Sequence, residues 1–221
     1  MGEFDHIYLS HPFTMMVSGP TSSGKTVFVR RILKNHNVLM RNIQKPLLSV
    51  AWCYGQWQKC YNEEVDNTKI SYSSGLLSKT EIESTDIDVL IIDDLMSELA
   101  NSTLLAELFT RGSHHNNLSV IFITQNIFHQ GSKMRDIHLS CQYLILMNNP
   151  RDKSQIDYLV KQMKMKRQLV FAYNDATSKP YGYLFIDFKQ QTPRSQMLKS
   201  RLTPEESIEE KFEPIIYVVA D

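Results

Sequence analysis

The residues with the clearest chemical pattern form a glycine-rich segment near the start of the chain. The sequence GPTSSGKT, residues 19–26, matches the pattern G-x-x-x-x-G-K-[ST] in full. Glycine lets backbone N–H groups curl around phosphate oxygens, because it has no Cβ in the way. The pattern therefore predicts a phosphate-binding loop made of Gly19, Pro20, Thr21, Ser22, Ser23, Gly24, Lys25 and Thr26.

The last two residues of this loop carry the polar groups that nucleotide chemistry needs. Lys25 would bring a positive charge to the β- and γ-phosphates of a triphosphate, and the Thr26 hydroxyl would ligate Mg²⁺. ATP and Mg²⁺ are therefore the expected cofactors. The alternative interpretation is a Gly/Ser-rich turn with an exposed lysine. An apolar segment before the loop and a helical one after it favour phosphate binding.

Two neighbouring carboxylates, Asp93 and Asp94, close the strongly apolar segment 88–93, which we expect to be a buried strand. In P-loop enzymes an aspartate at the end of such a strand holds Mg²⁺, so we assign Asp93 to the metal. Asp94 is then the candidate catalytic residue that polarises the attacking water. The alternative is that both aspartates cap a following helix.

Two further catalytic candidates flank the apolar segment 118–125. Gln125 ends it, and a glutamine at the carboxyl end of a strand between the phosphate loop and the acidic strand can sense the γ-phosphate or orient water. Arg111 precedes it, and arginine stabilises phosphoryl charge, often from a neighbouring subunit. The alternatives are a plain loop or cap residue for Gln125 and a solvated helix-end residue for Arg111.

Short apolar, β-branched runs alternate with amphipathic segments along most of the chain, which is typical of a mostly parallel sheet covered by helices on both faces. The sequence therefore predicts the α/β fold class of P-loop NTPases. Segments 169–173 and 181–188 are expected to add a C-terminal β-hairpin. Strands are expected at 13–18, 47–54, 69–72, 88–93, 118–125 and 142–148, and helices at 26–36, about 97–112 and 152–166.

The pattern of elements weakens after residue 188. We therefore expect one P-loop ATPase domain over residues 1–188 and a polar C-terminal tail over residues 189–221, which either follows the surface or is disordered. The final apolar run, IIYVVA, has two open interpretations, an edge strand or a contact in an oligomer.

The charge count excludes two classes of protein. The chain has 24 basic and 24 acidic residues, so it is neither a uniformly basic nucleic-acid coat protein nor an acidic disordered tail. Seven basic residues and no acidic one lie in 6–62, whereas ten acidic residues lie in 63–100. The three cysteines form no C-x-x-C pair, which favours a reducing intracellular compartment, and the apolar runs are too short to predict a membrane span.

Taken together, the segments GPTSSGKT, LIIDDL and LFTRGSHHNNLSVIFITQN, with NPRDKSQI after them, resemble the FtsK/HerA superfamily of P-loop ATPases over roughly residues 10–188. The likeness is greatest to the genome-packaging ATPases of poxviruses, other large DNA viruses and Polinton/Maverick transposons. It implies a ring-forming homo-oligomer that pumps double-stranded DNA into a preformed capsid. Capsid proteins are then further partners, and the location is the host cytoplasm or nucleus, or the virion.

The resemblance also assigns roles to individual residues. It implies that Lys25 and Thr26 are the loop lysine and threonine, Asp93 the metal aspartate, Gln125 the strand-end glutamine, and Arg111 the residue that reaches into the next subunit's site. In one respect the sequence departs from the family pattern. Many members have glutamate as the second acidic residue, where this chain has the shorter Asp94.

Other functions remain as alternatives at this stage. A helicase or recombination ATPase of the same superfamily would share every motif. A nucleotide-gated assembly or binding protein that hydrolyses ATP slowly would share the phosphate loop. A nucleoside monophosphate kinase is disfavoured, because the sequence offers no basic lid segment for a second nucleotide.

Overall fold

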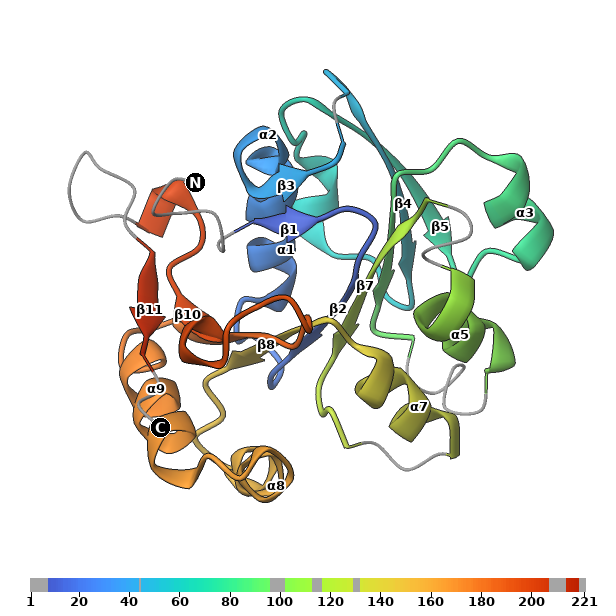
Figure 1. Cartoon of the computed structure of the whole chain (residues 1–221). Helices are drawn as coiled ribbons and strands as arrows, with labels where there is room; N and C mark the ends of the chain where they lie inside the picture. Colours follow the sequence, from blue (N-terminus) through green and yellow to red (C-terminus); the bar gives the residue numbers. More distant parts are fainter. Residues whose placement is uncertain are drawn as a thin grey trace.

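A mixed sheet organises the part of the chain that the computed structural model describes, namely residues 8–43, 45–95, 102–112, 117–128, 132–206 and 214–218 (Figure 1). Within these residues its nine strands have the order β11-β10-β9-β8-β2-β7-β6-β4-β5. The strands are β2 (Thr14–Ser18), β4 (Leu48–Tyr54), β5 (Thr68–Ser74), β6 (Val89–Asp93), β7 (Ser119–Thr124), β8 (Tyr143–Met147), β9 (Tyr183–Asp187), β10 (Leu198–Ser200) and β11 (Ile215–Tyr217). Two short strands, β1 (Leu9–Ser10) and β3 (Met40–Arg41), pair separately.

Helices cover both faces of this sheet. One face carries α1 (Lys25–Lys34) and α2 (His36–Leu39). The other carries α3 (Lys79–Ser84), α5 (Thr103–Glu107), the π-helix η2 (Leu108–Gly112), α7 (Ser132–Ser140), α8 (Ser154–Met163) and α9 (Lys166–Ala176). Three 3-10 turns complete the described elements, η1 (Lys59–Asn62), η3 (Arg194–Gln196) and η4 (Pro204–Glu206). No helix in the described ranges has the length and apolar character needed to cross a membrane.

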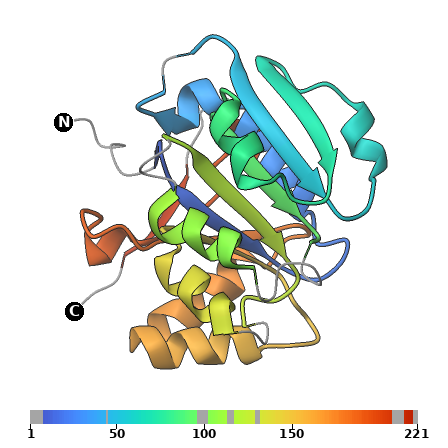
Figure 2. The ribbon, with the colours of Figure 1, turned by 90° about the vertical axis from the view of Figure 1, so that its right-hand side faces the viewer.

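Six neighbouring strands of the sheet run parallel, in the order β5-β4-β6-β7-β2-β8, which confirms the predicted fold class. Every residue of β2, β6, β7 and β8 is buried, because helices pack on both sides of these strands. At the edge, β5 alternates between exposed and partly buried residues. Figure 2 shows the twist of the sheet from β5 (cyan) to the orange and red C-terminal segments.

The remaining strands are antiparallel. β9 pairs with β8 and with β10, and β10 pairs with β11 at the edge of the sheet. The predicted C-terminal hairpin is therefore present, but β9 and β10 form it. The last apolar run supplies the edge strand β11. Two strands from residues 189–221 thus extend the sheet, while the division of the chain at residue 188 stays a prediction.

One predicted strand is wrong. Residues 169–173 lie inside helix α9, not in a hairpin. The sequence predicts a strand there because the run LVFAY is apolar throughout, and five residues are too few to show the repeat of a helix. Leu169, Ala172 and Tyr173 are buried on one face, whereas Phe171 is 67% exposed on the other. A strand would instead place residues 169, 171 and 173 on the same face.

Candidate nucleotide-binding site

The loop between β2 and α1 has the backbone geometry that phosphate binding requires. Ser22 and Gly24 adopt left-handed conformations, with φ of 64° and 94°. The N–H of Gly19 donates to the carbonyl of Thr124 (3.2 Å), which fixes the start of the loop to β7. A Cβ on Gly19 would lie 2.5 Å from the Cβ of Met147, so crowding excludes any larger residue there. The loop is therefore compact and anchored to the sheet.

Two polar side chains of the loop, those of Lys25 and Ser23, point toward the loop's own backbone or are buried beside it. Lys25 Nζ donates to the carbonyls of Gly19 (2.6 Å) and Pro20 (2.8 Å), which folds the lysine back over the loop. Burial lowers the pKa of Lys25, and the negative charges of Asp93 and Asp94 oppose this shift. Ser23 Oγ is buried and has no hydrogen-bond partner in the described part of the chain. The ammonium group and the Ser23 hydroxyl are both suited to phosphate oxygens.

Thr26 and Asp93 lie together, as expected for two ligands of one cation. Thr26 Oγ1 donates to Asp93 Oδ2 (3.2 Å), and the hydroxyl of Tyr61 donates to the same oxygen (2.8 Å). Burial raises the pKa of Asp93, and the hydrogen bonds from Tyr61 and Thr26 partly offset this rise. The burial of a carboxylate whose hydrogen-bond donors are neutral hydroxyls favours the arrival of a cation.

The donor set fits Mg²⁺. Thr26 and Asp93 offer hard oxygen ligands, and Mg²⁺ in nucleotide sites takes one or two protein ligands and completes its shell with phosphates and water. In the described ranges, no group of three or more His, Cys, Asp or Glu side chains is placed to hold a metal ion. A soft, fully protein-coordinated metal site is therefore not formed by these residues.

Asp94 differs from its neighbour Asp93 in its exposure and in its backbone conformation. Its side chain is exposed to the cavity, and its backbone is left-handed with a φ of 56°. Gly55 makes room for this turn, because a Cβ there would lie 2.3 Å from the Asp94 carbonyl oxygen. Gly55 N–H also donates to the Asp93 carbonyl (3.0 Å). Because of this turn, the Asp93 carboxylate is buried at the end of β6, whereas the Asp94 carboxylate is exposed in the cavity.

Gln125 lies between the phosphate loop and the acidic strand. In the strand register, Thr124 pairs with Ser18 on one side and Ile123 pairs with Asp93 on the other. Gln125 follows directly and is exposed to the cavity. The position of Gln125 agrees with the prediction, while its role as a γ-phosphate sensor stays a prediction. Arg111 ends up in η2, but its side chain lies outside the described part of the structure.

A cavity of about 650 Å³ collects these groups at the carboxyl ends of the parallel strands. Six of the predicted loop residues, 21–26, line it, as do Asp93, Asp94 and Gln125. Gly19 and Pro20 do not line it; they contribute through their carbonyls, which hold Lys25. Its position at the strand ends, over a helix N-terminus, is where α/β proteins bind nucleotides.

Tyr61 is a site residue that the sequence analysis did not identify. It lies in η1, 32 positions before Asp93, and no local motif marks it. It belongs to a cluster of aromatic rings with Trp52, Trp57 and Tyr72, at centroid distances of 5.1–5.3 Å from Tyr61. Trp57 is half-exposed and lines the cavity. The cluster holds the Tyr61 hydroxyl against Asp93.

Gln155 is a second residue whose role the sequence did not reveal, although it lies in the NPRDKSQI segment. It is buried at the start of α8, and its Oε1 accepts hydrogen bonds from Ser18 Oγ (3.0 Å) and Ile127 N–H (3.2 Å). Ser18 directly precedes the phosphate loop, and Ile127 follows Gln125 by two residues. Gln155 therefore braces the two strand ends that carry the loop and the candidate sensor.

Comparison with known families decides where the chain belongs. The sequence profile of the family described as "Poxvirus A32 protein" matches residues 1–175. The chain belongs to the poxvirus A32 protein family. This membership confirms the predicted likeness to poxvirus proteins of the P-loop ATPase class. Among curated protein sequences, none matches this A32 family chain.

Solved structures share the fold of this A32 family member. One is B204, the DNA-packaging ATPase from Sulfolobus turreted icosahedral virus, at 14% identity and a TM-score of 0.55, covering 82% of this chain and 96% of that one. Another is the genome-packaging NTPase B204 from Sulfolobus turreted icosahedral virus 2 in complex with AMPPCP, at 16% identity and a TM-score of 0.54, covering 82% and 95%. At these identities the likeness shows a common P-loop NTPase fold.

Proposed function

We propose that the chain is an Mg²⁺-dependent ATPase that translocates double-stranded DNA and packages a viral or virus-like transposon genome into a capsid. The observation that carries the ATPase part is the convergence of Lys25, Thr26 and Asp93 on one cavity. Support for the DNA-packaging part comes from membership of the poxvirus A32 family and from the fold shared with B204, which is named a DNA-packaging ATPase.

The positions of the residues support the following roles. The loop amides and Lys25 hold the triphosphate, and Lys25 exchanges its bonds to the loop carbonyls for bonds to phosphate oxygens. Thr26 and Asp93 hold Mg²⁺, which, when bound, neutralises charge on the phosphates. The helix dipole of α1 adds positive potential at the same point.

Hydrolysis itself falls to Asp94 and Gln125. The exposed Asp94 carboxylate accepts a proton from water as the water oxygen attacks the γ-phosphorus, and the bond to the β-phosphate oxygen breaks to release ADP and phosphate. The Gln125 amide orients that water and contacts the γ-phosphate. Both side chains line the cavity, and neither occupies a position needed for packing.

Arg111 is proposed to act in a neighbouring subunit of a homo-oligomeric ring. Mixing an Arg111→Ala subunit with a Lys25→Ala subunit is expected to restore part of the activity, because the mixture contains complete sites. Recovery is measured as ATP turnover across mixing ratios, with co-assembly checked by mass. Full co-assembly without any recovery would contradict a role in trans.

A helicase or recombination ATPase is the rival that shares the site. A triplex-displacement assay separates the two, because a translocase on duplex DNA removes a third strand without separating the other two. We expect ATP-dependent displacement of the third strand and no unwinding of a forked duplex, with Lys25→Ala as the inactive control. Unwinding of the fork would favour the helicase, and neither activity would favour a nucleotide-gated assembly protein.

A further inference from the structure

The cavity extends well beyond the groups that would hold phosphate and metal. Its lining also includes Arg31 on α1, Tyr181 and Tyr183 around the start of β9, and Glu206 in η4. Arg31 lies six residues after Lys25 in helix α1. Because an α-helix rises about 1.5 Å per residue, Arg31 lies roughly 9 Å farther along the helix axis than Lys25. This distance is comparable to the reach of a nucleotide from its phosphates to its base.

Helix α1 separates the two ends of the cavity. On one side of the helix, Thr26 contacts Asp93, and Arg30 contacts the carbonyl of Glu63 (2.8 Å). On the other side, the ring of Phe28 packs against Tyr183, with centroids 4.5 Å apart. The side of α1 that faces Tyr183 also carries Arg31, because residues three or four apart lie on the same side of a helix. By the same spacing it includes positions 24 and 35 at the two ends of the helix. The metal end therefore faces β6, and the opposite end faces β9.

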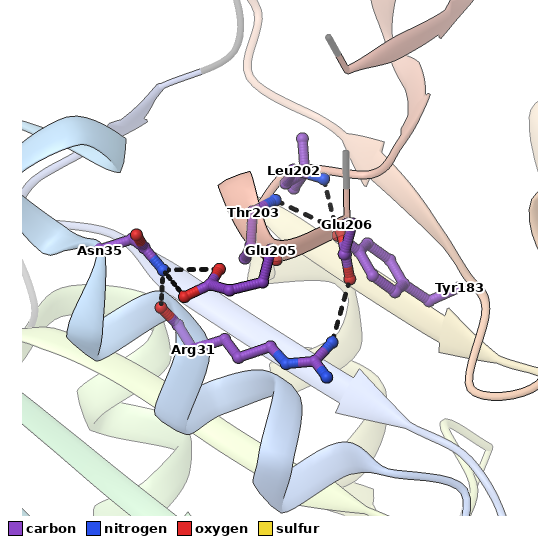
Figure 3. A network of polar contacts seen from close by, with 7 residues as sticks. All are labelled: Arg31, Asn35, Tyr183, Leu202, Thr203, Glu205 and Glu206. Carbon is purple, nitrogen blue, oxygen red and sulfur yellow. Dashed lines mark hydrogen bonds and ion pairs between the residues drawn. The ribbon is translucent and has the colours of Figure 1, made fainter. Parts of the chain in front are cut away.

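The C-terminal segment builds the wall at the β9 end (Figure 3). Tyr183 donates to Glu206 Oε2 (2.7 Å) and accepts from the N–H of Leu202 (2.7 Å). Arg31 Nη1 lies 3.6 Å from Glu206 Oε1. Burial raises the pKa of Glu206, and the hydrogen bond from Tyr183 opposes the rise. Glu206 is thus held against α1 and borders the cavity, and its neighbours in the C-terminal segment support it.

Tyr181 presents an aromatic ring at this end of the cavity. Its side chain is 70% exposed, although it lines the cavity and reaches Gly24, where a Cβ would lie 3.1 Å from Tyr181 Cδ1. Its backbone is left-handed, with a φ of 61°. The next residue, Gly182, permits the turn because a Cβ there would lie 2.3 Å from the Ala176 carbonyl oxygen. A strained backbone thus supports an exposed ring beside the phosphate loop.

We propose that this end of the cavity is the subsite for the nucleotide base, and that Tyr181 stacks on the base. The proposal rests on the function proposed above, since it concerns the same cavity. An exposed, planar ring next to a phosphate site suits the flat face of a purine, because stacking needs a π-face and no fixed hydrogen-bond pattern. The wall of Tyr183, Arg31 and Glu206 limits the subsite on the C-terminal side.

The test compares two ligands that differ by the nucleoside. Dissociation constants for ATP and for inorganic tripolyphosphate are measured by calorimetry with Mg²⁺ on the full chain. We expect Tyr181→Ala to weaken ATP binding about 5- to 150-fold, as for the loss of one stacked base, and to leave tripolyphosphate binding unchanged. Tyr181→Phe keeps the ring and is expected to bind ATP within about twofold of the parent chain.

Two controls complete the design. Phe171→Ala removes another exposed aromatic ring, one that does not line the cavity, and is expected to change neither constant. Lys25→Ala is expected to weaken both ligands, because it acts on the phosphates. If Tyr181→Ala weakens both ligands equally, Tyr181 supports the phosphate loop through Gly24 and the proposal is wrong. An unchanged ATP constant also overturns it. ATP binding that depends on Tyr181 without any turnover would leave the subsite intact while contradicting the motor.

Discussion

Two buried aspartates, Asp93 at the end of β6 and Asp187 at the end of β9, are 2% and 3% exposed but have different partners. Asp93 lies in the parallel part of the sheet and accepts hydrogen bonds from the neutral hydroxyls of Tyr61 and Thr26. Asp187 lies in the antiparallel part and accepts from Lys199 Nζ (3.2 Å), which is itself fully buried. Asp187 thus accepts a hydrogen bond from a charged lysine, whereas Asp93 accepts hydrogen bonds from neutral hydroxyls, and Lys25 acts on it through its charge alone.

This difference separates a structural charge from a functional one. A buried ion pair holds a strand in place, because removing either partner leaves an uncompensated charge. Burying a carboxylate whose partners are neutral costs free energy, and a bound cation offsets that cost. Cation binding at Asp93 is therefore expected to stabilise the folded chain. In the proposed function, the parallel part of the sheet supplies the chemistry, and the antiparallel part supplies one wall of the same cavity.

The largest expected effect is on Asp93. Asp93→Asn keeps the shape and the hydrogen-bond acceptor but removes the charge that we propose holds Mg²⁺, so we expect ATP turnover to fall by about 10³- to 10⁵-fold. Turnover is measured at saturating ATP over a range of Mg²⁺ concentrations. Activity within tenfold of the parent chain would show that Asp93 is a structural residue like Asp187.

Asp187→Asn is expected to act on stability instead. It removes the carboxylate charge beside the buried ammonium group of Lys199, which should lower the free energy of unfolding by about 3–5 kcal/mol at pH 7. The effect should depend on pH. Burial lowers the pKa of Lys199 and Asp187 opposes this, so the variant's lysine has a still lower pKa. Above that pKa the unfolded state binds more protons than the folded state, so the free energy of unfolding rises with pH.

Urea unfolding at pH 7 and at about pH 9.5, below the ordinary lysine pKa of about 10.4, measures this prediction. We expect the deficit of Asp187→Asn to shrink at the higher pH. A deficit that is the same at both values, or below about 1 kcal/mol at pH 7, would contradict the account of the buried pair.

Tyr61→Phe tests the neutral partner of Asp93. It removes the 2.8 Å hydrogen bond but keeps the ring, so we expect the Mg²⁺ concentration for half-maximal turnover to rise about 10- to 100-fold. Fluorescence of Trp57, whose ring packs against Tyr61 at the cavity, gives a second readout of metal and nucleotide binding.

Tyr72→Phe is the matched control for this variant. Tyr72 stacks on Tyr61, and its hydroxyl accepts a weak 3.4 Å hydrogen bond from Arg30, away from Asp93. Its Mg²⁺ dependence should match that of the parent chain. An equal shift in both variants would mean that the aromatic cluster acts through packing and not through the Tyr61 hydroxyl.

The smallest effect is expected at the surface of the C-terminal segment. Glu205 contacts Asn35 (2.9 Å) and Lys34 (3.8 Å) in exposed positions, so Glu205→Gln should change the free energy of unfolding by no more than about 0.5 kcal/mol. Thermal unfolding measures this change. A loss above about 1.5 kcal/mol would show that this exposed residue, and not the partly buried Glu206, anchors the segment.

The parts of the site that lie within single segments could be predicted from the sequence. The phosphate loop is continuous. Asp93 ends a strand, and Asp94 and Gln125 directly follow one, and the apolar residues of these strands reveal them in the sequence. Tyr61 and Tyr181 could not be predicted, because they reach the cavity through the topology of the sheet. The sequence predicts a strand at 169–173, where the structure has a helix, because a five-residue apolar run fits the two-residue repeat of a strand as well as the 3.6-residue repeat of a helix. The helical repeat becomes visible only when the apolar residues at 165 and 176 are included.

Steady-state ATP hydrolysis with Mg²⁺, measured in the presence and absence of double-stranded DNA, tests whether the chain is a DNA-translocating ATPase. We expect turnover to rise several-fold with duplex DNA and to fall by about 10²- to 10⁴-fold in Asp94→Asn, as for the loss of a general base. Negligible turnover that responds neither to duplex DNA nor to Asp94→Asn would contradict a DNA-translocating ATPase.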